Sequence, residues 1–293
     1  MNYLLQKSGN YFDKYFSAKN VRKVELLILR FAVLAFLIHL FIIFLGNNFF
    51  YFKNLQHSYL KAIYTPFSFI LFYEVFLLVI IIPKSISEFV GKQFEVITLI
   101  TLRGFFHDIA DLDLKNFINI NNPEFISLLY DLLASLFMLG LTILYYKIYN
   151  NNRKSEIFNE LNNFINIKKL VSISMILILF LLSISSLYGW GTEMWGALKL
   201  NQNYPNPNTV FYADFFSIMI FVDVLLLIIS FIYHFSFFTI FRNASFIITT
   251  ILIRISLTLE KPMNYTVILI GFLFSIMSFY LCSLRNTKNK LTE

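Results

Sequence analysis

The chain has 293 residues, of which 58% are hydrophobic and only 14% are charged, whereas soluble domains average about 45–50% apolar and about 25% charged residues. Runs of roughly 20 apolar residues, each long enough to cross about 30 Å of hydrocarbon, recur along it. These features exclude a soluble domain, and we predict an all-α, polytopic membrane helix bundle. The net charge of +7 does not indicate a nucleic-acid partner, because the lysines and arginines lie between the apolar runs.

The apolar segments divide the chain into five parts. Residues 1–25 mix aromatic and basic side chains, which predicts an amphipathic cytoplasmic segment on the membrane surface. The first membrane repeat, residues 26–146, holds predicted spans over 26–45, 66–82, 89–106 and 125–146. After a cytoplasmic linker, residues 147–169, the second repeat, residues 170–284, holds predicted spans over 170–188, 210–233, 241–259 and 265–284. Residues 285–293 form a basic tail.

Between the fifth and sixth spans lies the segment Gly189–Asn208, in which glycines, prolines and two tryptophans indicate an irregular loop at the membrane interface.

Eight spans would place both termini on one side of the membrane. The segments on that side carry most of the lysines and arginines, so we expect a multi-pass protein of the inner (plasma) membrane with both termini in the cytoplasm. The third span is interrupted by Lys92, Glu95 and Arg103. An alternative is therefore seven spans with residues 89–106 lying on the surface, although that arrangement fits the charge distribution less well.

An acid and an arginine recur at matching places in two apolar hairpins. Glu74 lies in the second span and Arg103 in the third, while Asp223 lies in the sixth span and Arg254 in the seventh. Acid and arginine are about 30 residues apart in both hairpins. We therefore predict two parallel four-helix repeats, related by an axis near the membrane normal.

Charged groups in mid-bilayer are costly, so they usually pair or face a wet cavity. A long arginine side chain reaching back along its helix could meet the acid of its hairpin. The sequence leaves two interpretations open for each pair, a structural salt bridge between helices or the lining of an ion path.

Three further side chains are candidates for an ion path. Asp131 and Asp214 lie within about two turns of the predicted outer face, where they would form either an acidic vestibule or solvated helix ends. His39, in the middle of the first span, would either relay protons or form a hydrogen bond to a neighbouring helix.

Enzymatic and cofactor-binding motifs are missing from the sequence. It contains no metalloprotease HExxH motif, no nucleophile elbow and no phosphate-binding glycine loop. Its four histidines are too dispersed for a membrane haem, and one cysteine forms no cysteine metal cluster. We therefore expect neither an enzyme nor a metal or cofactor site.

The leading hypothesis is a channel-like or transporter-like protein that moves a small ion, a cation or a proton, past Glu74, Arg103, Asp223 and Arg254. Its partners would be the lipid bilayer and either copies of itself or other membrane subunits. The alternative is a non-catalytic membrane subunit that anchors or assembles a larger complex.

Overall fold

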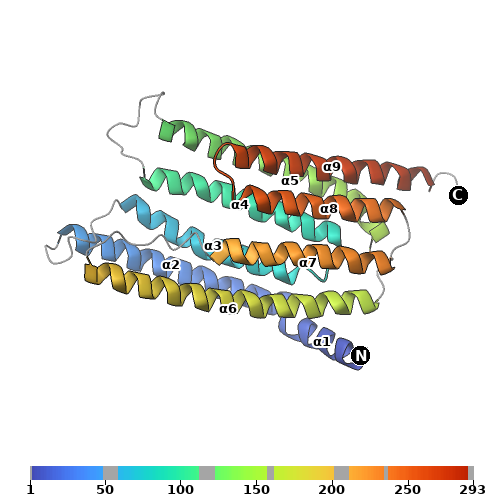
Figure 1. The fold of residues 1–293 in the computed structure, drawn as a ribbon, viewed down its shortest axis with the longest axis horizontal. Helices are drawn as coiled ribbons and strands as arrows, with labels where there is room; N and C mark the ends of the chain where they lie inside the picture. The colour runs from blue at the N-terminus through green and yellow to red at the C-terminus, as the bar shows by residue number, and fades with distance from the viewer. Residues whose placement is uncertain are drawn as a thin grey trace. The chain divides into compact units, whose positions relative to one another are not determined.

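The computed structural model describes residues 2–48, 59–111, 123–156, 162–200, 211–233 and 237–289, and within these ranges it contains helices and short turns but no strand. The helices, shown in Figure 1, are α1 (Asn2–Tyr15), α2 (Ala18–Asn48), a short 3-10 helix (Tyr59–Ile63), α3 (Tyr64–Ile80), α4 (Ile86–Asp111), α5 (Pro123–Glu156), α6 (Asn162–Leu200), α7 (Phe211–Tyr233), α8 (Phe237–Ser256) and α9 (Met263–Asn289).

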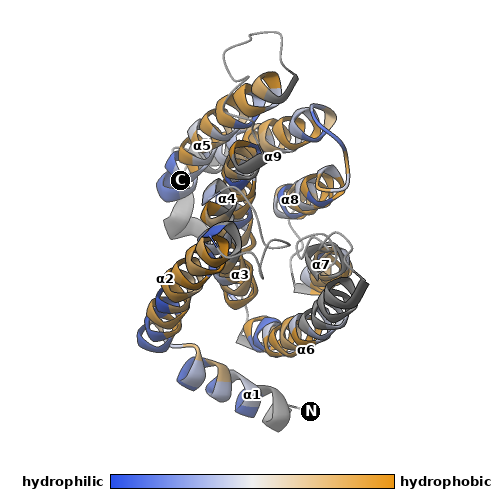
Figure 2. Cartoon of the chain, turned by 90° about the vertical axis from the view of Figure 1, so that its left-hand side faces the viewer, coloured by the Kyte–Doolittle hydropathy of each residue, from blue (hydrophilic) through white to orange (hydrophobic). Residues whose placement is uncertain are grey.

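Six helices in the described ranges are long and apolar enough to cross a membrane, judged by length and composition. The segments that qualify are Ala18–Leu45, Phe125–Asn151, Phe164–Ser186, Phe215–Ile232, Phe237–Ser256 and Met263–Leu284. Apolar residues, orange in Figure 2, predominate along α2, α5 and α9. The helical fold is thus confirmed and fits a membrane bundle, whereas the count of eight spans in two repeats stays a prediction.

Helix α4, which contains the predicted third span, is 26 residues long but too polar to qualify as a span by composition. Nevertheless, none of its described residues is exposed. A helix on the membrane surface would turn a polar face to water, and the described part of α4 presents no such face. A helix covered by protein needs no lipid-compatible surface, which explains how α4 accommodates polar side chains.

Several helices extend beyond the predicted spans. α5 continues to Glu156 and α6 begins at Asn162, so most of the predicted linker is helical, and residues 157–161 lie outside the described ranges. α6 continues to Leu200, so the expectation of an irregular loop is wrong for residues 189–200, and residues 201–208 lie outside the described ranges. A glycine costs a helix only about 1 kcal/mol relative to alanine, too little to end one that good helix formers flank.

The chain packs into two compact units. The first unit comprises Met1–Lys14, Leu78–Phe94 and Leu141–Glu293, and the second comprises Tyr15–Leu77 and Glu95–Gly140. The first unit therefore contains the beginning of α4 together with α6, α7, α8 and α9.

Five buried rings form an aromatic core in the first unit: Phe94, Tyr145, Phe246, Phe272 and Phe279. Phe94 of α4 stacks on Phe272 of α9 with ring centroids 3.7 Å apart, and it meets the edge of Tyr145 of α5 at 5.0 Å. Because a buried phenol needs a polar partner, the Tyr145 hydroxyl donates a hydrogen bond of 2.7 Å to the backbone carbonyl of Ser87. The core thus joins four helices around the beginning of α4.

Small side chains bring α8 and α9 close together. The Thr249 hydroxyl donates a hydrogen bond of 3.2 Å to the Gly271 carbonyl, and the hydroxyls of Ser245 and Ser278 lie 2.6 Å apart. In lipid, where apolar burial provides little driving force between helices, such close backbone packing and interhelical hydrogen bonds hold helices together. The α8–α9 hairpin is accordingly a closely packed part of the first unit.

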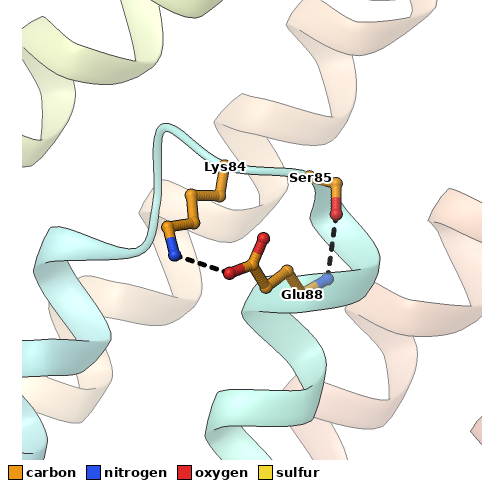
Figure 3. A network of polar contacts seen from close by, with 3 residues as sticks. All are labelled: Lys84, Ser85 and Glu88. Carbon is orange, nitrogen blue, oxygen red and sulfur yellow. Dashed lines mark hydrogen bonds and ion pairs between the residues drawn. The ribbon is translucent and has the colours of Figure 1, made fainter. Parts of the chain in front are cut away.

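The beginning of α4 is capped by its own sequence (Figure 3). The Ser85 hydroxyl accepts a hydrogen bond of 3.1 Å from the Glu88 backbone amide, and the Lys84 ammonium lies 2.6 Å from the Glu88 carboxylate. Ser-x-x-Glu at this position is the capping-box pattern. The cap and Glu88, an acid in the first turn, stabilise the helix end at which the polar α4 begins.

Helix α6 holds the turn between α3 and α4 in place. Its Lys168 ammonium donates a hydrogen bond of 2.7 Å to the Lys84 carbonyl, and its Ser172 hydroxyl donates one of 2.7 Å to the Val79 carbonyl. These carbonyls lie in the last turn of α3 and just beyond it, where helical partners run out. The turn between α3 and α4 is therefore anchored by α6 as well as by the cap of α4.

Replacing the cap should loosen the beginning of α4. Ser85→Ala removes an acceptor for a backbone amide, and we expect it to cost about 1 kcal/mol. Ser85→Asp, which keeps an acceptor, serves as the control. Thermal unfolding of the purified protein in detergent measures the difference, and equal melting temperatures for Ser85→Ala and Ser85→Asp would contradict the cap.

The aromatic core gives a second prediction. Phe94 is 0% exposed, whereas Phe221 on α7 is 76% exposed. Truncating a buried phenylalanine costs about 3–5 kcal/mol in soluble cores, so Phe94→Ala should lower the melting temperature strongly and Phe221→Ala should leave it nearly unchanged. The pair is compared by fluorescence-detected size exclusion after heating. Similar losses for both variants would show that the rings do not form the core described here.

Candidate functional site

The second acid and arginine form a buried ion pair. Arg254 Nη1 lies 2.7 Å from Asp223 Oδ2, and the two side chains are 4% and 1% exposed. The Thr250 hydroxyl donates a hydrogen bond of 3.0 Å to the same carboxylate oxygen. Helix α8 thus supplies both a cation and a neutral donor to one oxygen of an acid on α7.

The helical geometry explains why these side chains meet. Thr250 and Arg254 are four residues apart, so they lie on the same face of α8. Side chains of a helix tilt toward its N-terminus, which carries the guanidinium of Arg254 back to the level of Thr250. The contact expected from the sequence between this acid and this base is therefore present, and whether it lines an ion path stays a prediction.

Gln93 of α4 completes the cluster. It is 4% exposed, and its side-chain amide lies beside the Asp223 carboxylate. The Asp223 carboxylate therefore has three neighbours, the guanidinium of Arg254, the hydroxyl of Thr250 and the amide of Gln93.

Sequence reasoning missed Gln93. It singled out Lys92, Glu95 and Arg103 because these interrupt the apolar pattern by their charge. An uncharged amide in a half-polar helix gives a weaker signal. Gln93 is adjacent in sequence to Phe94, which belongs to the aromatic core. Gln93 therefore lies in the same compact unit as Asp223.

Less is established for the first acid and arginine. Glu74 is half-buried on α3, and Arg103 is 8% exposed on α4, both in the second unit. An ion pair between them stays a prediction.

Asp131 of α5 is 0% exposed, so the interpretation as a solvated helix end is wrong for this residue. Its Oδ2 atom lies only 3.0 Å from the place that a Cβ atom on Gly104 of α4 would occupy. The missing side chain at Gly104 lets the carboxylate pack against the backbone of α4. Asp214 lies in the first turn of α7, and its side chain is outside the described part of the structure.

His39 forms the neighbouring-helix contact that the sequence left as one of two interpretations. Its Nδ1 lies 2.6 Å from the Thr65 hydroxyl oxygen, which joins α2 to α3 within the second unit. A proton-relay role for His39 stays a prediction.

Within the described residues, no three histidine, cysteine, aspartate or glutamate side chains gather where they could hold a metal ion. The polar centre of the first unit instead combines carboxylate, amide and hydroxyl oxygens with a guanidinium, all from three helices.

Comparison with protein-family models, with curated protein sequences and with solved structures found no match. The class of protein is therefore inferred from the sequence and the fold of this chain alone. The long apolar helices fit a multi-pass integral membrane protein, and its distinguishing feature is a buried polar centre made by Gln93, Asp223, Thr250 and Arg254.

The contact between Asp131 and Gly104 gives a third prediction. Gly104→Ala would place a methyl group against a fully buried carboxylate, and we expect a net loss of about 1–2 kcal/mol from overpacking. The matched control is Gly140→Ala on α5, where a Cβ atom meets nothing within 4 Å and alanine should gain up to about 1 kcal/mol in helix propensity. Melting temperatures in detergent compare the two. A gain in stability for Gly104→Ala would contradict the contact.

Proposed function

We propose that the protein moves a small ion, a cation or a proton, across an inner or plasma membrane past the pair Asp223–Arg254. The observation that carries this proposal is the buried pair itself, which the Thr250 hydroxyl and the Gln93 amide join. Asp223 lies near the middle of α7, and that helix is otherwise one of the most apolar in the chain.

The pair Asp223–Arg254 is costly to place inside a membrane. A charged side chain at the bilayer centre costs at least about 2.5–3.5 kcal/mol on insertion scales. A well-packed apolar pair of similar volume is often as stable as a buried ion pair, or more stable. A charge pair at this depth therefore adds little to stability, which is consistent with a functional role such as ion passage.

In this proposal Arg254 acts as a gate. It lies one turn, about 6 Å along the axis, before the turn at Thr258. Residues 258–262 of that turn are exposed and include Glu260 and Lys261. Because a long arginine side chain can extend its charged end toward water, the guanidinium can alternate between Asp223 and this polar turn.

The other candidate residues belong to the second unit and extend the proposal. Glu74 and Arg103 would form the corresponding pair of a second hairpin, and Asp131 and His39 would supply further polar groups within it. Asp214 would attract cations at the outer end of α7. With both termini in the cytoplasm, as the distribution of basic residues favours, Asp214 would face the opposite side.

Ion flux into proteoliposomes tests the role of the pair. Asp223→Asn and Arg254→Gln each leave a buried charge without its counter-charge, so each should cost about 3–5 kcal/mol in stability and reduce flux at least tenfold. The double variant should recover stability, because two amides replace two charges, but it should not recover flux. The control is Asp13→Asn, which changes an aspartate whose side chain is 62% exposed.

The double variant separates function from structure. If it folds as stably as the wild type and also transports ions at the wild-type rate, the pair is only a structural bridge and the proposal is wrong.

A second candidate function rests on α2. Only 17% of its apolar window is buried, and large side chains such as Phe31, Leu34 and Phe41 are more than half exposed. This surface suits either lipid or another membrane subunit, and the second option corresponds to a subunit that assembles a larger complex. Purification after mild detergent extraction distinguishes them, because co-purifying subunits in fixed stoichiometry favour assembly and a homo-oligomer favours transport.

A further inference from the structure

We infer that helix α1 binds the headgroups of anionic phospholipids through the face that carries Lys7, Tyr11 and Lys14. This lipid site lies outside the polar centre around Asp223, and it does not depend on the movement of an ion. Three features of the first unit support it: the contacts of α1 with α6, the level of those contacts along α6, and the charge on the opposite face of α1.

Helix α1 is held against the beginning of α6. A Cβ atom on Gly9 would lie 2.6 Å from Asn166 Oδ1, so the two helices approach each other closely at this point. One turn further along α1, Asp13 Oδ2 lies 2.6 Å from the Lys169 ammonium. Phe12, which precedes this acid, is only 7% exposed. One face of α1 is therefore covered by protein.

The contacts with α6 lie at the level where lipid headgroups are expected. Helix α6 is long and apolar enough to cross a membrane over Phe164–Ser186. Asn166 and Lys169 are two and five residues beyond the start of this segment, which corresponds to about 3 Å and about 8 Å along the helix axis. The headgroup layer is about 5–8 Å thick on each side of the hydrocarbon core. Helix α1 is therefore attached close to the boundary between headgroups and hydrocarbon.

The face of α1 opposite these contacts is basic. Lys7, Tyr11 and Lys14 follow one another at spacings of four and three residues, so they share one side of the helix. Both lysines are exposed, and Tyr11 is 48% exposed. The one acid in the sequence of α1, Asp13, is paired with Lys169 at the covered side. The exposed face of α1 thus carries two positive charges beside an aromatic ring.

These side chains suit a headgroup that carries a net negative charge. Long lysine side chains extend their ammonium groups toward phosphate, and basic residues near a membrane surface are attracted by anionic lipids. A tyrosine ring has an apolar body and a polar tip, which is why tyrosine is enriched at membrane interfaces. With the N-terminus in the cytoplasm, as the distribution of basic residues favours, α1 would meet the leaflet in which anionic lipids are concentrated.

Hydrogen exchange of the full chain in lipid nanodiscs tests this contact. Nanodiscs of phosphatidylcholine alone are compared with nanodiscs that also contain phosphatidylglycerol. Bound headgroups oppose local opening of a helix, so we expect the backbone amides of residues 2–15 to exchange at least about fivefold more slowly with phosphatidylglycerol. Exchange in α8 and α9 should be the same in both lipids. Equal exchange of residues 2–15 in the two kinds of nanodisc would overturn the site.

Variants of the two lysines test whether charge provides the binding. The double variant Lys7→Gln/Lys14→Gln should lose the protection, whereas Lys7→Arg/Lys14→Arg keeps both charges and should retain it. The control is Lys261→Gln, which removes an exposed lysine from the turn between α8 and α9 and should leave the protection of α1 unchanged. Exchange in α8 and α9 reports whether each variant is folded. Protection that persists without the two charges, or is lost with arginine, would contradict the site.

Inorganic phosphate distinguishes a lipid surface from a site for a free anion. Added to phosphatidylcholine nanodiscs, it should leave the exchange of α1 unchanged, and protection by phosphate alone would overturn the assignment to lipid. Salt provides a further test, because the Debye length falls to about 3 Å at about 1 M salt. The protection by phosphatidylglycerol should therefore weaken at this concentration, and protection that salt does not alter would overturn a site based on charge.

Discussion

The carboxylate of Asp223, held near the middle of an apolar helix, is the constraint on which the first unit depends. Hydrocarbon offers no water to solvate it, so its partners must come from the protein, and they come from α4 and α8. This requirement fixes the register of α7 against α8, because rotating α8 by one residue would turn Thr250 and Arg254 away from the acid together. A buried charge thus specifies a single packing where apolar side chains alone would tolerate several.

The second consequence concerns α4. Lipid-facing helices must be apolar all along their outer surface, whereas a helix covered by protein escapes that requirement. α4 has no exposed residue in its described part, and it carries the amide of Gln93 and the guanidinium of Arg103. The cap and the stacking of Phe94 on Phe272 hold the beginning of α4, which carries Gln93, in the first unit. Rigid support of this kind lets a polar side chain keep one orientation in a low-dielectric interior.

Sequence patterns located some of these features and not others. Asp223 and Arg254 stood out because charges are rare in apolar runs, and their spacing allowed an arginine to reach back to the acid. The burial of Asp131 did not follow from its sequence position, because it depends on a glycine in another helix that admits the carboxylate. The extension of α6 through residues 189–200 was mispredicted because glycines were weighed more heavily than the helix-forming residues around them.

The sequence by itself determined the helical class, indicated a membrane environment and singled out the charged residues of the apolar runs, since these depend on composition and on periodicity along the chain. The tertiary structure alone decided that Asp223 meets the guanidinium of Arg254, the hydroxyl of Thr250 and the amide of Gln93. Hydrogen-bond partners in a helical bundle come from helices distant in the chain, and only packing determines which faces meet. The arrangement of side chains in the polar centre is therefore set by the tertiary structure.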